Sequence, residues 1–343
     1  MEKQGKKWRG FYRDHRGAKR SKTFGRQREA LSWARSKESE ASRLTGDLVL
    51  FEDFWNEWWA GHRITLRPKT VDLIESIARV HLLPRFGALA VQEISTMDIQ
   101  VWVNDLDRSG KSPHTVRNYA FRMRSVMAAA VERRMILANP FDQVSVPKVQ
   151  QREMCFLDFE QLMRLAATAG YYGSLIRFLG VSGLRFGEAA GLYPSDFGTD
   201  MKSVSVRRQL FEAGGKLQEG PPKTKAGRRT VGLPSKLSTH LMGFSEEAGQ
   251  IKYFFETPSA TPLRLSAFHH NVWSKLAVGE FQGLRVHDLR HTAISMWIRL
   301  GADPKLVAAM AGHSSTQRVF DLYGHLYPNA DASLMSSLDD ALE

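Results

Sequence analysis

Four side chains near the C-terminal end of the chain belong to residue types that handle phosphate esters. His287 and Arg290 stand three residues apart, and His313 and Tyr323 follow them. Residues three apart share one face of a helix, so His287 and Arg290 can address the same group. Histidine moves protons near neutral pH, and arginine binds two phosphate oxygens at once. The set predicts phosphate chemistry in which a tyrosine is the nucleophile.

The elements that must position these side chains are short helices. Asp303, followed by a proline, is expected to be a helix N-cap, and Gly312 ends that helix. Ser314 or Ser315 can cap the next helix, which would carry Tyr323 at or just beyond its end. We therefore expect three successive helices, the third of which folds back toward the first.

Two further candidates lie earlier in the chain. Arg185 follows a glycine-bearing turn and is expected at a helix start, with Glu188 three residues later on the same face. Glu188 could orient the guanidinium group from there. An arginine in such a place is usually a surface salt-bridge partner, so its position alone assigns it no function.

Two lysines lie in a loop between predicted strands. Alternation predicts one strand over residues 204–210, and a second strand over 230–233 follows the loop. Lys223 and Lys225 stand at or beside the tip of the resulting hairpin, between a proline and a glycine. The loop alone is typical of a solvated basic turn. The functional alternative is a mobile lysine that reaches into a DNA site and donates a proton.

The composition limits the class of protein. The 343 residues are 43% hydrophobic, which suits two or three globular domains. A net charge of +12 indicates a polyanionic partner. The single cysteine, Cys155, excludes an intramolecular disulfide and a cysteine-only zinc site, and fits a reducing cytoplasm. Neither a membrane-spanning run nor the apolar core of a signal peptide is found, so no membrane association is expected.

Residues 1–46 are very basic. They hold 14 Lys and Arg against five Asp and Glu, a net charge of +9. Aromatic residues predict strands around Phe11 and Phe24, with a turn at residues 15–17 between them. A helix over about 29–42 follows. A small sheet with interleaved aromatic and basic side chains can lie against a DNA duplex. The alternative is a disordered basic tail.

Residues 47–148 are expected to be all-helical. An apolar stripe at helical spacing near the start is more typical of a core than of a base-stacking platform. Further helices are expected over about 68–81, ending before Pro84, from about residue 96, and over 113–134. The basic residues of the last helix fit either a DNA-facing or a merely solvated surface. The stripe comprises Phe51, Phe54, Trp55, Trp58 and Trp59.

Residues 149–343 are expected to form one further domain after a charged linker. Asp158 with Gln161 resembles a capping box that opens a helix. His269 and His270 could suggest a metal site, but adjacent histidines point apart on a helix or a strand. No carboxylate or cysteine cluster joins them, so no bound metal is expected.

Five motifs occur in an order and at spacings that resemble a known family. Together they resemble the tyrosine recombinases, in particular the integrases of temperate phages and conjugative elements. The motifs are SGLRFGE with Arg185, PPKTKAGRRTVGLP with Lys223, HDLRH from His287, GHSS from His313, and DLYGHL with Tyr323.

The resemblance implies a multidomain α+β protein. Residues 1–46 would be a small β-sheet and helix domain that binds arm-type DNA sites. Residues 47–148 would be an all-α core-binding domain. Residues 149–343 would be a mixed α/β catalytic domain, with helices around a small antiparallel sheet.

The resemblance also implies how the strand is cut. Arg185 and Arg290 would clamp the nonbridging oxygens of the scissile phosphate and stabilise charge developing at phosphorus. Tyr323 would attack, giving a 3′-phosphotyrosine and a free 5′-hydroxyl. Arginine charge would do the work that divalent metals do in other nucleases, so neither a metal nor a nucleotide cofactor is implied.

Four more residues receive roles from the same resemblance. Lys223 would protonate the leaving oxygen, with Lys225 as the competing candidate. His287 would accept or donate the tyrosine proton. His313 would hydrogen-bond the phosphate, and Glu188 would support the site structurally. Tyr327 is a second tyrosine near the motif, but the distance from the preceding GHSS motif favours Tyr323 as the nucleophile.

The implied partners are double-stranded DNA attachment sites, within a homotetramer assembled on DNA. A DNA-bending host factor and an excision directionality factor are possible further partners, in the cytoplasm of a bacterial cell. Leucines at intervals of four near the C-terminal end predict a short helix with one apolar stripe, which would dock on a neighbouring protomer or on its own domain. A topoisomerase-like relaxer, an element transposase and a regulator with an inactive site are the alternative functions.

Overall fold

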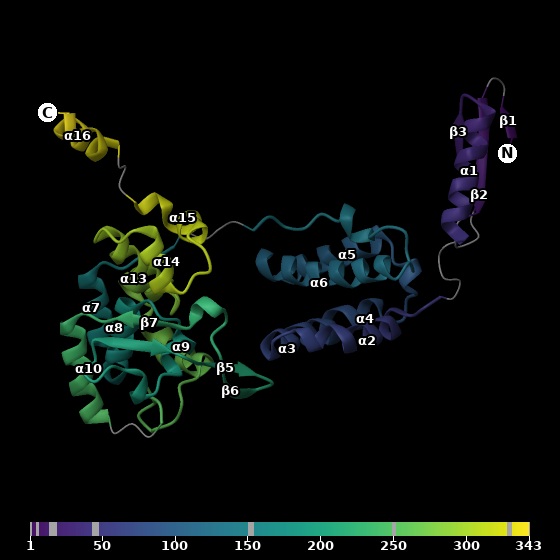
Figure 1. Ribbon diagram of the computed structural model, residues 1–343. Helices are drawn as coiled ribbons and strands as arrows, with labels where there is room; N and C mark the ends of the chain where they lie inside the picture. Colours follow the sequence, from purple (N-terminus) through teal and green to yellow (C-terminus); the bar gives the residue numbers. More distant parts are fainter. Residues whose placement is uncertain are drawn as a thin grey trace. The chain divides into compact units, whose positions relative to one another are not determined.

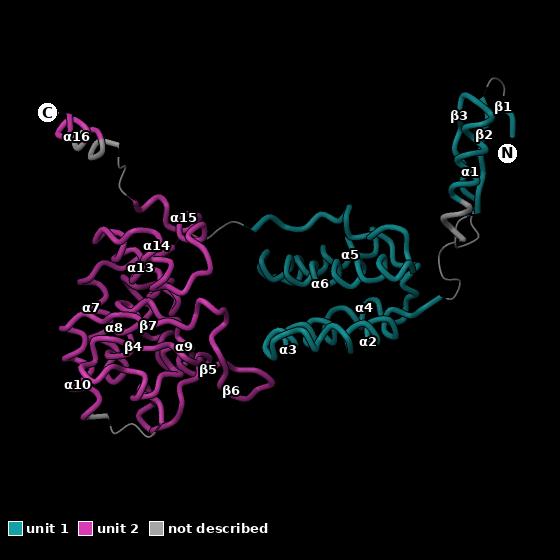
Figure 2. Tube along the Cα trace, in the orientation of Figure 1, with its two compact units in different colours: residues 1–151 teal, residues 152–343 magenta. Residues whose placement is uncertain are grey.

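The computed structural model divides the chain into two compact units, residues 1–151 and 152–343 (Figure 2). No helix in the described part of the chain is long and apolar enough to cross a lipid bilayer. The structure describes residues 2–4, 7–13, 19–42, 48–149, 154–248, 252–327 and 331–342.

The first unit begins with a three-stranded antiparallel sheet and one helix (Figure 1). The strands are β1 (Glu2–Gln4), β2 (Lys7–Arg13) and β3 (Lys19–Phe24), in that order across the sheet, and α1 spans Gln27–Ser42. The two predicted strands and the helix are confirmed. The short β1 was not predicted, and the predicted turn at 15–17 lies outside the described residues.

Helix α1 packs on one face of this sheet. A Cβ atom on Gly10 would lie 2.6 Å from the carbonyl oxygen of Ala30 in α1, so the close approach requires a glycine. The ring of Trp33 lies 5.4 Å from Tyr12 and 5.5 Å from Phe24, which makes these aromatic residues a small core. Side chains alternate along a strand, so Lys7, Arg9, Phe11 and Arg13 of β2 point to the face opposite α1.

The rest of the first unit is helical, as predicted, over described residues 48–149. Trp55 and Trp59 of the predicted apolar stripe are buried with both phenylalanines, and Trp58 is half-buried. Short 3₁₀ turns occur at Arg63–Thr65, Val91–Glu93 and Pro140–Gln143. The main helices are α2 (Phe51–His62), α3 (Pro68–Ile77), the π-helical turn η2 (Ala78–Leu82), α4 (Leu83–Phe86), α5 (Thr96–Arg108) and α6 (Pro113–Glu132).

The second predicted helix ends before Pro84, as expected, but a short helix that was not predicted follows it at once. The chain passes from α3 through η2 into α4, and Pro84 occupies one of the first positions of α4. The amide of Leu83 donates a hydrogen bond to the carbonyl of Ala78, five residues back. A wider π turn followed by a new helix start accommodates the proline, because a helix start does not need the missing N–H.

The second unit is a mainly helical domain with two small β-ladders, which agrees with the expected mixed α/β class. Its larger elements are α7 (Phe159–Thr168), α8 (Gly173–Ser182), α9 (Phe186–Ala190), β4 (Ser203–Val206), β5 (Gln209–Ala213), β6 (Lys216–Gly220), β7 (Arg229–Gly232), α10 (Ser235–Ala248), α13 (Asp288–Arg299), α14 (Pro304–Ala311), α15 (Gln317–Tyr323) and α16 (Asp331–Leu342). Its shorter elements are η5 (Gly170–Tyr172), η6 (Pro194–Asp196), η7 (Lys225–Gly227), α11 (Leu265–Phe268), η8 (His269–Trp273), α12 (Ser274–Leu276), η9 (Gly279–Phe281) and η10 (Gly324–Leu326).

The predicted strand over 204–210 is two strands. β4 pairs antiparallel with β7, while β5 turns away and pairs with β6 in a separate hairpin. Between β4 and β5, Arg208 donates a hydrogen bond to the buried carboxylate of Asp196 and stacks over the ring of Tyr193, 3.8 Å from its centroid. This ion pair holds Arg208 between the two strands, at the place where the alternating sequence pattern predicted one continuous strand.

Candidate active site

The turn between α8 and α9 presents Arg185. Gly183 ends α8 with a φ of +64°, and a Cβ atom there would lie 2.5 Å from the ring of Trp297, so only glycine fits. Arg185 follows as the N-cap residue of α9, as predicted, and 27% of its side chain is exposed. The guanidinium group is therefore fixed at a helix start yet reachable from solvent.

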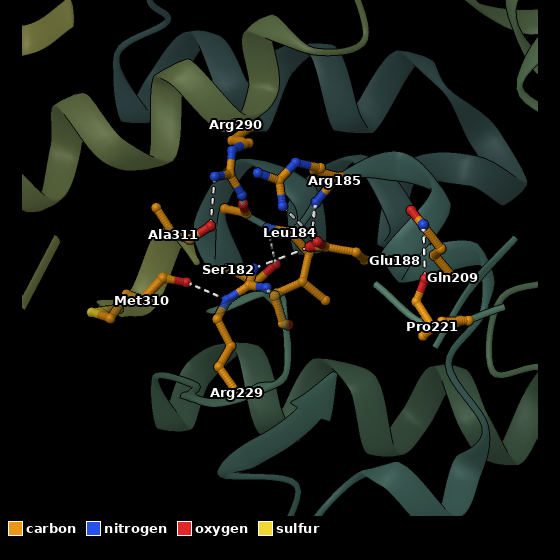
Figure 3. Close-up of polar contacts among 12 residues, drawn as sticks. Ser182, Leu184, Arg185, Glu188, Gln209, Pro221, Arg229, Arg290, Met310 and Ala311 are labelled. Atoms are coloured by element: carbon orange, nitrogen blue, oxygen red, sulfur yellow. Dashed lines mark hydrogen bonds and ion pairs between the residues drawn. The ribbon is translucent and has the colours of Figure 1, made fainter. Parts of the chain in front are cut away.

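Glu188 lies one turn into α9 and is fully buried. Its carboxylate accepts hydrogen bonds from Nη1 of Arg185 at 2.7 Å and from the Arg185 amide at 3.0 Å. It also accepts one from Nη2 of Arg229 at 3.1 Å, and Figure 3 shows the carboxylate between the two guanidinium groups. Burial acts to raise the pKa of Glu188, but the charges of Arg229 and Arg185 outweigh it and lower the pKa below 4.5.

Arg229 is a site residue that the sequence did not reveal. Its side chain is 7% exposed, and its Nε donates to the carbonyl oxygen of Met310 at 2.6 Å. It thus ties β7 to α14 and to Glu188. The adjacent Arg228 is exposed. Nothing in the local sequence distinguishes the two arginines except that alternate residues of a strand face opposite sides.

Arg290 lies beside Arg185 (Figure 3) and is 3% exposed. Its Nη1 donates to the carbonyl oxygen of Gly183 at 2.7 Å, and its Nη2 donates to that of Ala311 at 2.5 Å. One planar guanidinium group therefore joins the ends of α8 and α14. Burial lowers the pKa of Arg290 to about 9, so the group remains charged at neutral pH.

His287 stands at the N-terminal end of α13, one turn before Arg290. The start of α13 is held by the buried Asp288, which accepts a hydrogen bond from the amide of Arg285 at 2.7 Å. Although part of His287 is exposed, packing around the ring and the charges of His291 and Arg290 lower its pKa to about 4. The imidazole is neutral at pH 7.

Helix α14 brings His313 to the same place. The side chain of Asp303 caps the helix by accepting from the amides of residues 305 and 306, and Gly312 ends it with a φ of +65°, as predicted. The half-buried His313 follows, and its Nδ1 has no hydrogen-bond partner in the described ranges. Burial and then the charges of Arg290 and Arg185 lower the pKa of His313 to about 3.

Tyr323 is the last residue of α15, which folds back as expected, because Tyr323 shares a buried cluster with Ile294 and Ile298 of α13. The residue is 1% exposed, and its hydroxyl lies 2.5 Å from Nδ1 of His291. Burial raises the pKa of Tyr323 to about 12. The predicted serine cap of α15 is wrong, because the N-cap residue is Thr316, whose carbonyl accepts from the amide of Val319 at 2.8 Å.

His291 is the second site residue that the sequence did not single out. It lies four residues after His287, and the rings of the two histidines are 5.0 Å apart and nearly perpendicular. Its place on the helical face of His287, one turn on, was a usable signal. Tyr327, the competing tyrosine, directly follows η10. It is half-buried, and burial raises its pKa.

Lys223 and Lys225 are both exposed and lie between β6 and β7. They are not at a hairpin tip: the tip between β5 and β6 is formed by two glycines with positive φ, at positions 214 and 215. The loop nevertheless approaches the site. A Cβ atom on Gly312 would lie 2.9 Å from the carbonyl oxygen of Ala226, so this loop packs against the residue that precedes His313.

The assembled site is rich in fixed positive charge. The guanidinium groups of Arg185, Arg229 and Arg290 surround one carboxylate, that of Glu188, and the exposed Arg318 of α15 lowers the pKa of both His313 and Tyr323. Such a set can bind an anion with several oxygens and place it near a tyrosine hydroxyl.

Comparison with known proteins gives matches along most of the chain. Residues 50–106 match the N-terminal SAM-like domain of phage integrases, and residues 155–330 match the phage integrase family. The ICEBs1 integrase of Bacillus subtilis (strain 168) is 24% identical over 309 residues, which are 86% of this chain and 84% of the relative. The integrase of Mycobacterium phage L5 is 27% identical over 316 residues, 89% of this chain and 82% of the relative.

Solved structures show the same fold. The Tn1549 transposon integrase in complex with a circular intermediate DNA has a TM-score of 0.72 at 19% identity, covering 85% of this chain and 100% of that one. A lambda integrase tetramer bound to a Holliday junction has a TM-score of 0.61 at 16% identity, covering 89% of this chain and 93% of that one.

Proposed function

Because the chain belongs to the phage integrase family, we propose that the arginine cluster with His313 and Tyr323 is the catalytic centre of this recombinase. The chain is a site-specific tyrosine recombinase, an enzyme that cuts and rejoins DNA in the integration of a mobile element. The cluster is proposed for this chemistry because it combines fixed guanidinium groups, neutral imidazoles and a tyrosine hydroxyl in one place.

Phosphate binding is assigned to Arg185, Arg290 and His313. The two guanidinium groups lie side by side, and Arg185 is partly exposed while Arg290 is anchored by two backbone carbonyls. A neutral imidazole carries one N–H, so His313 can donate a hydrogen bond to a phosphate oxygen. The phosphate charge would offset the arginine charges that, after burial, lower the pKa of His313. Glu188 holds the arginines in register without cancelling their combined charge.

Cleavage is assigned to Tyr323 and Lys223. The Tyr323 oxygen attacks phosphorus, the bond to the 5′-oxygen breaks, and a 3′-phosphotyrosine remains. The leaving 5′-oxygen takes a proton from Lys223, which is exposed and lies on the loop that packs beside Gly312. The tyrosine gives its proton to a histidine, for which His287 is the family-based candidate. The reverse steps join the tyrosine-linked strand to a new 5′-hydroxyl, and neither a metal nor a nucleotide is required.

DNA binding outside the catalytic centre is assigned to the two other domains. The sheet of residues 1–46 leaves the basic side chains of β2 on the face opposite α1, which suits arm-type sites. Residues 47–148 would bind the core site. The domain limits 1–46, 47–148 and 149–343 are part of this proposal.

We further propose a homotetramer on DNA, as in the lambda integrase structure on a Holliday junction. A DNA-bending host factor, a directionality factor for excision and action in the bacterial cytoplasm belong to the same proposal. Helix α16 exposes Leu338 and Leu342, at 46% and 85%, and would dock on a neighbouring protomer. Deleting residues 331–343 should spare single-site cleavage but prevent tetramer formation, and unchanged recombination by the truncated protein would refute the trans docking.

The observation that carries the proposal is the pairing of the arginine cluster with a buried tyrosine hydroxyl at one end of α13. The test is incubation with nicked attachment-site DNA, followed by a denaturing gel that detects a covalent protein–DNA adduct. Adduct formation without strand exchange between two sites would favour a topoisomerase-like activity instead. No adduct with any site from the element would overturn the proposal.

A further inference from the structure

The hydroxyl group of Tyr323 has one close polar neighbour among the described residues, and it is not His287. Nδ1 of His291 lies 2.5 Å from the tyrosine oxygen. The aromatic rings of the two residues are 5.8 Å apart, and both side chains belong to helices, α13 and α15, which share one buried hydrophobic cluster. The contact therefore joins two fixed elements.

The direction of this hydrogen bond follows from the state of each partner. Burial raises the pKa of Tyr323 to about 12, so its oxygen carries a proton at neutral pH. Burial also lowers the pKa of His291, so its imidazole is neutral. A neutral imidazole whose Nδ1 faces a hydroxyl accepts from it and keeps its own proton on Nε2. The tyrosine O–H thus donates to His291.

Among the described residues, His291 but not His287 is hydrogen-bonded to the hydroxyl group of Tyr323. His287 touches the edge of the His291 ring, and no hydrogen bond joins it to Tyr323 in the described ranges. The groups that influence His291 are Asp288, Arg285 and Arg290, besides the neighbouring His287. A positive imidazole beside two arginines is unfavourable until an anion enters, which the scissile phosphate would supply.

We propose that His291 is the catalytic base of strand cleavage, the residue that takes the proton from Tyr323 when it attacks the phosphate. The inference rests on the proposed role of Tyr323 as nucleophile. The proton passes from the Tyr323 oxygen to Nδ1 of His291 as the oxygen–phosphorus bond forms. The bond from phosphorus to the 5′-oxygen breaks, and that oxygen is protonated from Lys223. In the reverse step, His291 returns its proton to the leaving tyrosine.

The test is single-turnover cleavage of nicked core-site DNA by His291→Asn. Asparagine retains a hydrogen-bond acceptor close to the Nδ1 position but cannot accept a proton. We expect cleavage to slow by roughly 10²–10⁴-fold, the usual contribution of a general base. Core-site DNA binding and the melting temperature should match the wild type. His270→Asn, which changes an exposed histidine outside the site, is the control and should cleave at the wild-type rate.

A second substrate separates the two proton transfers. When sulfur replaces the bridging 5′-oxygen, the leaving thiolate needs no proton. Lys223→Ala should then regain most of its activity, whereas His291→Asn should stay slow. Raising the pH should speed His291→Asn by about tenfold per unit, as more of the tyrosine ionises without a base. A pH-independent defect would point to a merely structural role.

The outcomes distinguish this inference from the function on which it rests. If Tyr323→Phe still forms the adduct, the nucleophile itself is wrong. If Tyr323→Phe is inactive but His291→Asn cleaves within about threefold of the wild type, only the role of His291 is wrong. Rescue of His291→Asn by the sulfur substrate would also overturn it. Should His291→Asn fail to fold, His291→Gln, again unable to take the proton, serves in the same assays.

Discussion

The N-terminal sheet and the arginine cluster both gather positive charge, but they hold it in opposite ways. On the face of β2 that is opposite α1, Lys7 and Arg13 are exposed. In the cluster, Arg229 and Arg290 are buried, and each is bonded to a backbone carbonyl of α14. The sheet exposes its charged groups to solvent, whereas the cluster holds its guanidinium groups in fixed orientations.

This difference suits the exposed charges to binding affinity and the buried guanidinium groups to catalysis. Exposed charges attract a polyanion over a distance, are screened by salt and can substitute for one another. Burying a guanidinium group costs free energy, because the charge loses its hydration. That cost is offset where the fixed N–H donors must bind particular oxygen atoms. Substitutions in the sheet should therefore have small, similar effects, and those in the cluster large and individual ones.

The largest effect is expected for Tyr323→Phe. This change removes the oxygen that we propose attacks phosphorus and keeps the ring, which lies 6.4 Å from that of Phe156. The variant should bind core-site DNA normally and form no covalent adduct on a denaturing gel. Tyr327→Phe is the matched control and should still form it. The reverse pattern in the two variants would move the nucleophile to Tyr327.

The next largest effect is expected for Arg290→Lys. A lysine keeps the charge but cannot reach the carbonyls of Gly183 and Ala311 together, so the phosphate-facing geometry is lost. Cleavage should fall roughly 10²–10³-fold, as for the loss of one preorganised donor, and Arg185→Lys should behave similarly. Wild-type cleavage should continue in EDTA. An enzyme that regains activity only with added Mg²⁺ would contradict arginine-based catalysis.

Glu188→Gln tests what holds the cluster together. The carboxylate offsets two guanidinium groups in a buried place, so its loss should lower the free energy of unfolding by roughly 3 kcal/mol at pH 7. Because the folded-state pKa of Glu188 is lowered, its contribution is complete above 4.5 and fades as the pH falls through the folded value. The stability gap between wild type and variant should therefore narrow in acid.

The control for this measurement is Glu160→Gln, which alters a carboxylate whose side chain is 83% exposed. Urea unfolding of both variants at pH 7 and near pH 4 gives the comparison. Equal stability losses for the buried and the exposed position would mean that Glu188 does not organise the arginines.

The smallest effect is expected for Lys7→Ala in the sheet. If the sheet binds DNA as proposed, removal of one exposed positive charge should weaken DNA binding less than tenfold and reduce the slope of log affinity against log salt by about one. Deletion of residues 1–46 removes the whole net charge of +9, and should abolish binding to arm sites while sparing core-site cleavage. A single lysine change that abolishes binding would show that the sheet recognises DNA by fixed geometry, as the cluster does.

Helix ends were predicted correctly where the residues that cap the helix are its neighbours in sequence. The caps at Asp158 and Asp303 and the helix end at Gly312 are formed by neighbouring backbone groups, and all three agree with prediction. Predictions failed where a distant contact intervened. The strand over 204–210 is interrupted beside the ion pair of Arg208 with Asp196, a residue from η6.

The sequence by itself determined the family, the residue types of the candidate site and the helix that carries Tyr323. The tertiary structure decided which arginine accompanies Glu188 and which histidine meets Tyr323. Arg229 and Arg228 are neighbours in sequence, but only Arg229 faces α14 and donates to Met310. His291 contacts Tyr323 across 32 positions of the chain, and this distance is closed only when α15 packs on α13. Buried polar groups need partners, and partners far along the chain are supplied by packing.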